Sequence, residues 1–295
     1  MQGFTSAGFL FDEVTLMPQS FVNQAVARCS VEGAKLWFNC NPEGPLHHFK
    51  LEWIDKTEEK YGVRIHFVLD DNPSLSEKVK NRYKRMFSGV FYKRYILGLW
   101  VMAEGIIYDM FDLERHVTKD IPQTFDRYYL GVDYGTQNPT AFLLFGQKGM
   151  NLYCVDEYYY DGRATGKQKT DSEYSSDLQK FIKGRYPQSI LVDPSAASFI
   201  TQLRRDNVKN IRHANNKVLD GIRVVANFFS NDRLYMHPRC KNFINELATY
   251  AWDEKSQEKG QDIPLKENDH ACDAARYVIM TIFGREFYEE LEKAA

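Results

Sequence analysis

Short apolar runs that end in polar residues mark the first part of the chain. Residues 7–11 (AGFLF) are followed by Asp12 and Glu13, and residues 34–38 (AKLWF) are followed by the polar sequence NCNP. Runs of this length and composition predict buried strands. Polar residues directly after buried strands are typical of sites at the carboxyl ends of a parallel sheet.

The next stretch, residues 74–95, is charged and amphipathic and predicts helices rich in Lys and Arg. A solvated helix pair and a DNA-facing surface explain it equally well. Over residues 98–124 the pattern weakens, and Gly, Pro and mixed charges appear. We therefore expect a first domain over 1–98, a linker over 99–124 and a second domain over 125–295.

The second domain has a denser pattern of elements. Apolar runs separated by turns containing Gly and Pro predict three antiparallel strands in a meander, at 127–134, 140–146 and 151–160. Strands and helices then alternate, which predicts a mixed-sheet α/β fold. The expected strands are 189–193, 208–212 and 233–236, and the expected helices are 173–183, 196–205, 217–229, 240–249 and 268–285.

Two acidic residues stand at the ends of predicted strands. Asp133 ends the apolar run YYLGVD between Gly131 and Gly135, and Asp193 ends SILVD directly before Pro194. An aspartate in the position of Asp193 is, taken alone, more often a turn or helix-cap residue. Asp133 inside an apolar strand is harder to explain structurally.

Two more acids belong to the last predicted helix. Asp269 and Asp273 are four residues apart and share one helix face, with His270 three residues before Asp273. The rest of this helix is largely apolar, so it is expected to be buried, and buried carboxylates are costly unless they are paired or bind metal. Asp269 is equally well explained as the cap of the helix.

Together these acids favour a metal site. Carboxylate oxygens suit hard divalent cations such as Mg²⁺ and Mn²⁺. Hydrolysis of a phosphodiester by two such ions needs acids that converge from several elements. Asp133, Asp193 and Asp273 are expected to supply them.

The composition says more about the cellular compartment of the protein than about its function. The formal net charge is −2, which is weak evidence against DNA binding, because a local basic groove can exist in a neutral total. The 5 cysteines form no C-x-x-C pair, which indicates a reducing compartment and argues against a zinc ribbon. Neither a secretory signal nor a membrane-spanning run is evident, so a cytoplasmic protein is expected.

At GVDYGTQNPTA, LVDPSA and NDHACDAARY the sequence resembles the nuclease motifs of phage terminase large subunits, notably the group related to a defective Bacillus prophage. The resemblance implies a ribonuclease-H-like domain that cuts concatemeric double-stranded viral DNA with two Mg²⁺ or Mn²⁺ ions. It matches Asp133, Asp193 and Asp273 to the metal-binding acids of the family. His270 matches a histidine near the metals in some members, and Asp269 matches an acid of less certain role.

The upstream half extends this resemblance. GFLFDEVTLMP is similar to a Walker B strand, with Asp12 in the magnesium shell and Glu13 activating water. FNCNPEGPLHHF resembles the coupling segment of the family, with Asn39 and Asn41 as candidate γ-phosphate sensors. The family implies double-stranded DNA, the portal protein and the small terminase subunit as partners, in the host cytoplasm and at the portal vertex.

The P-loop of such an ATPase is missing. Only eleven residues precede Asp12, too few for G-x-x-x-x-G-K-[ST] and its strand. GRATGKQ at 162–168 is one residue short and is expected to be a solvated loop, whose Arg163, Lys167 and neighbouring Lys169 would meet DNA phosphates. We therefore expect a partial ATPase domain that uses ATP only if the P-loop half is supplied elsewhere. Either the sequence is the carboxyl-terminal product of a split or truncated terminase gene, or a separate chain supplies that half.

Two other functions stay open. A non-catalytic packaging module would bind portal, small terminase subunit and DNA, with the acids as relics. A different ribonuclease-H-like enzyme, such as a transposase or resolvase, is disfavoured by the Walker B-like segment. Two smaller expectations are that Glu157 either adjoins the site or lies at the surface, and that all four tryptophans, Trp37 among them, lie in cores.

Overall fold

The computed structural model describes residues 5–136 and 138–292, and it divides into two compact units. The first unit takes the described residues up to Lys84, with Gly89–Gly105 and Trp252–Ile263. The second unit takes Arg85–Ser88, Ile106–Ala251 and the described residues from Pro264 onward. The expected boundaries at 98 and 124 stay a prediction. Residues 1–4 and residue 137, within the GVDYGTQNPTA motif, lie outside the described residues.

Two short parallel strands organise the first unit. β1 (Gly8–Phe11) pairs with β2 (Lys35–Phe38), with Leu10 opposite Trp37. One face of the pair packs on an apolar cluster that includes helix α1 (Gln19–Val26). On the other face, Leu10 is 73% exposed and Trp37 is 63% exposed. The two strands are confirmed, but the prediction that Trp37 lies in a core is wrong, because only one face of this pair is covered.

A buried arginine joins distant segments of the first unit. Arg94 belongs to α3 (Gly89–Tyr95), which with α2 (Glu77–Met86) forms the predicted basic helical stretch. Its guanidinium lies 2.9 Å from Glu43, forms an ion pair with Asp262, and donates to the Val101 carbonyl oxygen. Since Asp262 follows the short helix α10 (Glu254–Gln257), this contact ties a late part of the chain into the first unit.

The second unit is built on one six-stranded mixed sheet. Its strands are β3 (Arg127–Asp133), β4 (Thr140–Lys148), β5 (Asn151–Tyr160), β6 (Ser189–Val192), β7 (Ile211–His213) and β8 (Leu234–Met236). Their order is β7-β6-β3-β4-β5-β8. The β3–β4–β5 meander is antiparallel, whereas β6 runs parallel to β3, β7 to β6 and β8 to β5.

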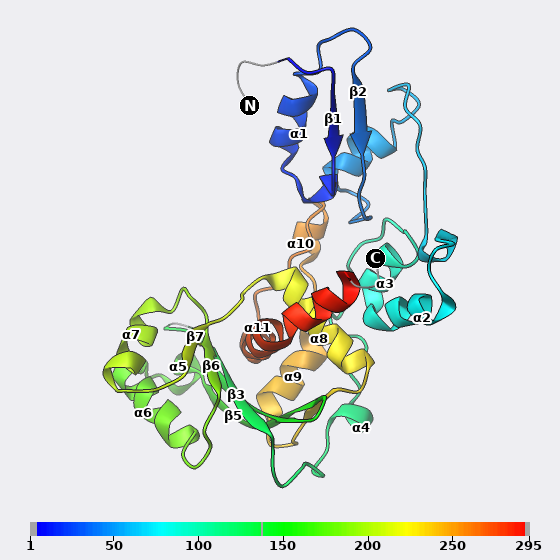
Figure 1. Cartoon of the computed structure of the whole chain (residues 1–295). Helices are drawn as coiled ribbons and strands as arrows, with labels where there is room; N and C mark the ends of the chain where they lie inside the picture. Colours follow the sequence, from blue (N-terminus) through cyan, green and yellow to red (C-terminus); the bar gives the residue numbers. More distant parts are fainter. Residues whose placement is uncertain (1–4, 137, 293–295) are drawn as a thin grey trace. The chain divides into compact units, whose positions relative to one another are not determined.

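Helices cover both faces of this sheet (Figure 1). Helices α6 (Asp171–Phe181) and α7 (Ala197–Arg205) pack on one face, and α9 (Lys241–Thr249) and α11 (His270–Glu292) pack on the other, with α8 (Val218–Ser230) against α11. The unit also contains two short helices, α4 (Leu113–His116) and α5 (Gly162–Thr165). The arrangement confirms the predicted α/β fold class. The GRATGKQ segment differs from its expected loop, because α5 forms there, capped by the Asp161 carboxylate. No helix of the described chain has the length and apolar character needed to cross a membrane.

Strand alternation assigns each face its partners. In β3, Leu130 and Val132 join the cluster formed with α6 and α7. Tyr129 packs its ring against Phe283 of α11, so the odd-numbered positions of β3, Asp133 among them, face that helix. The β4 run TAFLLFG is buried throughout, as expected of a strand covered on both sides.

Candidate active site

A glycine allows α11 to approach the strand that carries Asp133. A Cβ atom at Gly131 would lie 2.1 Å from the Ala274 carbonyl oxygen and 2.9 Å from Val278 Cγ2. Without a side chain at this position, the helix packs directly on the β3 backbone. This close approach brings the first turn of α11 to Asp133, the last residue of β3.

The first contact across this interface joins Asp133 and His270. His270 Nδ1 lies 2.9 Å from Asp133 Oδ2. Burial, reinforced by the nearby Asp273 charge, raises the pKa of Asp133 above its usual range. Burial alone would lower the pKa of His270, but the hydrogen bond to Asp133 outweighs it and raises that pKa. Both shifts favour a proton held between the two side chains.

Tyr277 links Asp133 to Asp193. Its hydroxyl lies 3.0 Å from Asp193 Oδ2 and 3.4 Å from Asp133 Oδ1. Burial would raise the pKa of Asp193, but hydrogen bonds from Ser195, Tyr277 and Asn216 lower it instead. The sequence motifs alone do not single out Tyr277, although its place four residues after Asp273 puts it on the same helix face.

The two helix acids share a lysine. Lys266 Nζ lies 3.1 Å from Asp269 Oδ2 and 3.5 Å from Asp273 Oδ2. The other oxygen of Asp273 accepts from the buried Arg276, with Nη2 2.8 Å away. Asp269 directly precedes α11, and its carbonyl oxygen accepts the Asp273 N–H at 2.7 Å. Asp269 therefore occupies the cap position and also faces the acidic group.

A fifth acid, Glu246 of α9, fixes the start of α11. Its Oε2 accepts the N–H groups of Ala271 at 2.6 Å and Cys272 at 3.0 Å, and its Oε1 accepts the Tyr159 hydroxyl at 2.9 Å. Burial raises the pKa of Glu246 to about 7. No sequence pattern selects this residue, since it lies 24 positions before His270 and shares no motif with it.

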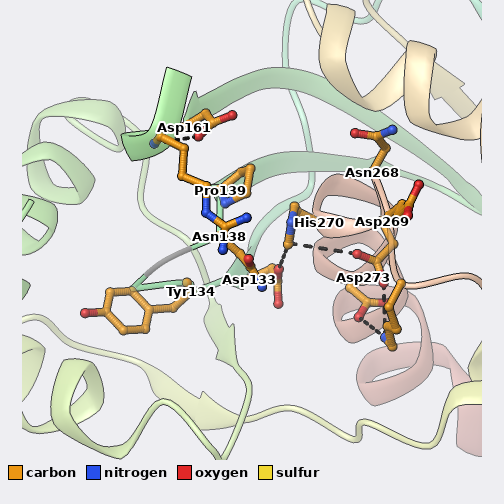
Figure 2. A pocket seen from close by; sticks show the side chains of 13 residues that line it. Asp133, Tyr134, Asn138, Pro139, Asp161, Asn268, Asp269, His270 and Asp273 are labelled. Atoms are coloured by element: carbon orange, nitrogen blue, oxygen red, sulfur yellow. Dashed lines mark hydrogen bonds and ion pairs between the residues drawn. The ribbon is translucent and has the colours of Figure 1, made fainter. Parts of the chain in front are cut away.

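Asp133, Asp269 and His270 border a pocket of about 530 Å³. Figure 2 shows His270 between Asp133 on one side and Asp269 on the other. Asp273 and Lys266 also line the pocket, as does Arg163 of α5. Asp193 reaches this group through Tyr277 rather than by lining the pocket.

The donor chemistry of the pocket suits a hard divalent cation, because its acids offer carboxylate oxygens. Within residues 5–136 and 138–292, however, no three His, Cys, Asp or Glu side chains are grouped closely enough to hold a metal ion as they stand. Each acid instead contacts an internal partner: His270 for Asp133, Tyr277 for Asp193, and Lys266 for Asp273. The residues fit the ion by type, and binding requires exchange of these partners.

The predicted DNA-binding cations lie in different surroundings. Of the three, Arg163 lines the pocket. Lys167 is exposed and lies 3.6 Å from Glu173. Lys169 pairs with Asp177 at 2.5 Å and lies 4.0 Å from the centre of the Tyr160 ring, so it has internal partners.

In the first unit, the Walker B-like acids meet the coupling-like asparagines. Asn39 Nδ2 donates to Asp12 at 2.7 Å, and the Glu13 N–H donates to Asn39 Oδ1 at 2.9 Å. Asn41 Nδ2 lies 3.3 Å from the Glu13 carboxylate. Glu13 has a left-handed backbone, with φ 52°. The four residues therefore form one connected polar group at the ends of β1 and β2.

Glu157 has neither expected role. Its carboxylate accepts the N–H groups of Asn242 at 2.9 Å and Phe243 at 3.0 Å. It thus binds the first turn of α9, the helix that carries Glu246.

Family models match both parts of the chain. The model described as a terminase RNase H-like domain matches residues 133–281. The model described as the T4-like-virus-type amino-terminal part of the terminase large subunit matches residues 1–115.

Individual relatives match over most of the chain. The terminase large subunit of Escherichia phage T5 is 29% identical over 290 residues, covering 92% of this chain and 65% of its own length. The structure of a large terminase from a thermophilic bacteriophage is 56% identical, with a TM-score of 0.91, covering 96% of this chain and 70% of that one. A structure of the same thermophilic phage protein in complex with ATP-γ-S has the same identity and TM-score and is covered over 72% of its length.

Proposed function

Because the chain belongs to the family of phage terminase large subunits, we propose that its second unit is a metal-dependent endonuclease that cuts concatemeric double-stranded DNA during packaging. The observation that carries this proposal is that Asp133 and Asp193 both lie within hydrogen-bond distance of one side chain of α11, the hydroxyl of Tyr277. Strand acids 60 residues apart in the sequence meet a helix whose own acids line the adjacent pocket.

In this proposal Asp133, Asp193 and Asp273 hold two Mg²⁺ or Mn²⁺ ions, with Asp269 beside them. The ions supply activation of water and stabilisation of the leaving oxygen. His270 holds or accepts a proton next to Asp133. Arg163, which lines the same pocket, would pair with a phosphate of the DNA backbone.

Plasmid digestion tests this function. Cleavage is expected with MnCl₂ or MgCl₂, to be absent in EDTA, and to fall by at least about 10²-fold in Asp133→Asn, since a carboxylate ligand is lost. Asp109→Asn, at an exposed position of the same unit, is the matched control and is expected to cut normally. Cutting in EDTA, or an undiminished Asp133→Asn variant, would overturn the proposal.

We propose further that the first unit is part of an ATPase domain and packs against a polypeptide segment that carries the P-loop. Two features support this: the paired group of Asp12, Glu13, Asn39 and Asn41, and an uncovered apolar face on β1 and β2. Parallel strands are normally covered on both faces, and a two-stranded sheet is marginal alone. Val63, Ile65 and Phe67 add further exposed apolar side chains, in a segment whose residues 61–67 are all exposed.

An ATPase assay tests this second proposal. Phosphate release is expected to be absent for this chain alone and to appear when a polypeptide carrying the P-loop half is added. Hydrolysis by this chain alone, lost in Glu13→Gln, would contradict it.

Portal protein and small terminase subunit are the proposed protein partners, in the host cytoplasm and at the portal vertex. The alternative of a non-catalytic packaging module is supported by the internal partners of Asp133, Asp193 and Asp273. It predicts binding to portal or small subunit without cleavage at any metal concentration. The plasmid experiment therefore separates the two functions.

A further inference from the structure

The acids at the start of α11 have two very different counter-ions. Arg276 is 2% exposed and contacts one oxygen of Asp273. Lys266 has a side chain that is 61% exposed, and its ammonium contacts the other oxygen of Asp273 and one oxygen of Asp269. The first cation is fixed in the core, whereas the second lies at the pocket and is free to move into solvent.

The Lys266 ammonium contacts one carboxylate oxygen of Asp269 and one of Asp273, so these two oxygens lie close to the same position. Asp269 and Asp273 are nearly buried, and burial of unpaired carboxylates is costly. Among the described residues, Lys266 is the only lysine or arginine within 4.0 Å of Asp269. Its loop is fixed at both ends, because the Leu265 N–H donates to the Ala251 carbonyl oxygen and Asp269 accepts from Asp273.

We propose that Lys266 is an internal counter-ion that neutralises Asp269 and Asp273 in the metal-free protein and is displaced when a divalent cation binds there. This inference rests on the proposed function. A cation on these oxygens repels the ammonium at short range, so the two cannot occupy the same oxygens. Lys266 therefore stabilises the metal-free pocket and competes with the metal.

Metal titration of the full chain tests this role without any activity measurement. Isothermal titration calorimetry with MnCl₂ is expected to show about three- to tenfold tighter binding for Lys266→Met than for the wild type. The expected gain is this large because the metal no longer has to break the ion pairs of Lys266. Lys266→Gln gives a second neutral variant. Lys266→Arg keeps the charge and is expected to return the affinity toward the wild-type value.

Thermal unfolding supplies the second readout. In EDTA, Lys266→Met is expected to melt about 2–4 °C below the wild type, and in saturating MnCl₂ this difference closes because the metal replaces the ammonium. The matched control is Lys148→Met, at a half-exposed lysine 3.1 Å from Asp126 and outside the pocket. It is expected to leave metal affinity unchanged and to shift both melting temperatures equally.

The outcomes separate the inference from the function on which it rests. Equal or weaker metal binding by both Lys266→Met and Lys266→Gln, with binding abolished in Asp273→Asn, overturns the role of Lys266 and leaves the metal site intact. Absence of metal binding in the wild type as well overturns the metal site itself, and the inference with it.

Discussion

At the scale of single residues, one phenol connects the acids at the ends of two strands, Asp133 and Asp193. The Tyr277 hydroxyl is within hydrogen-bond distance of both Asp133 and Asp193. Two neighbouring carboxylates repel each other when no cation lies between them. A hydroxyl that donates a hydrogen bond to them reduces this repulsion. Tyr277 therefore helps to hold the acids together before metal binds.

Tyr277→Phe keeps the ring and removes only this donor. In EDTA we expect the free energy of unfolding to fall by about 1–2 kcal/mol, the usual cost of a buried polar group left unpaired. In MnCl₂ the loss is expected to shrink, since a bound cation neutralises both carboxylates. Urea denaturation measures both values. Tyr186→Phe, at a position 87% exposed, is the control and should show no loss under either condition.

Glu246 gives a pH dependence whose sign follows from its raised pKa. Its pKa of about 7 in the folded protein exceeds the ordinary value of 4.5, so the folded state binds a proton more tightly than the unfolded state. The stability linked to this proton is complete below about pH 4.5 and is lost as the pH rises through about 7. Glu246→Gln removes this titration.

Relative to the wild type, Glu246→Gln is expected to gain stability as the pH rises from about 5 to about 8, by on the order of 3 kcal/mol. Denaturant unfolding at a series of pH values measures the difference. Glu286→Gln, an exposed glutamate on α11, should give a constant difference from the wild type. A constant difference for Glu246→Gln as well would show that its pKa is not raised.

At the scale of elements, the packing of α11 on β3 sets the geometry of the site. The helix backbone lies against Gly131, and the acids of the two elements meet one helical turn away. Helix and strand cannot separate without moving His270 and Asp273 away from Asp133. The element contact and the chemistry therefore depend on the same glycine.

Gly131→Ala introduces a methyl group 2.1 Å from a main-chain oxygen, which cannot move without shifting α11. We expect a loss of about 1–3 kcal/mol in stability and a fall in plasmid cleavage on the order of 10²-fold, because small displacements of catalytic groups are costly. Gly44→Ala is the control, since its methyl group would meet only an Arg94 nitrogen at 3.8 Å. Normal cleavage by Gly131→Ala would show that this approach does not position the acids.

At the scale of the whole molecule, the two units differ in how completely their sheets are covered. The sheet of the second unit is buried on both faces, whereas β1 and β2 in the first unit expose Leu10 and Trp37. Large exposed apolar side chains that are paired across strands mark a surface for another polypeptide. The proposed occupant is the polypeptide segment that carries the P-loop.

Trp37→Ser is expected to change the stability of this chain by less than about 0.5 kcal/mol, because the indole is mostly in solvent. It is expected to abolish the ATP hydrolysis that the added P-loop polypeptide restores. Phe11→Ala, on the covered face of β1, should cost about 3–5 kcal/mol and serves as the contrast. Full ATP hydrolysis with Trp37→Ser would show that this face does not bind the P-loop segment.

Patterns local in the sequence determined most of the elements. The apolar run at 189–193 predicted β6, and the alternation of 127–160 with its Gly and Pro turns predicted the meander, because hydrophobic periodicity and turn residues act over a few positions. The motifs around Asp133, Asp193 and Asp273 also determined the family, which the matches to known terminases confirm.

Contacts between residues far apart in the sequence were decided only by the tertiary structure. The contacts of Tyr277 with two aspartates and of Glu246 with the start of α11 both depend on how helices pack on the sheet and on one another. The exposure of Trp37 depends likewise on which face of its strand pair is covered. The sequence pattern shows which polar side chains will be buried and must form hydrogen bonds or ion pairs. The packing of the elements determines which residues form those contacts.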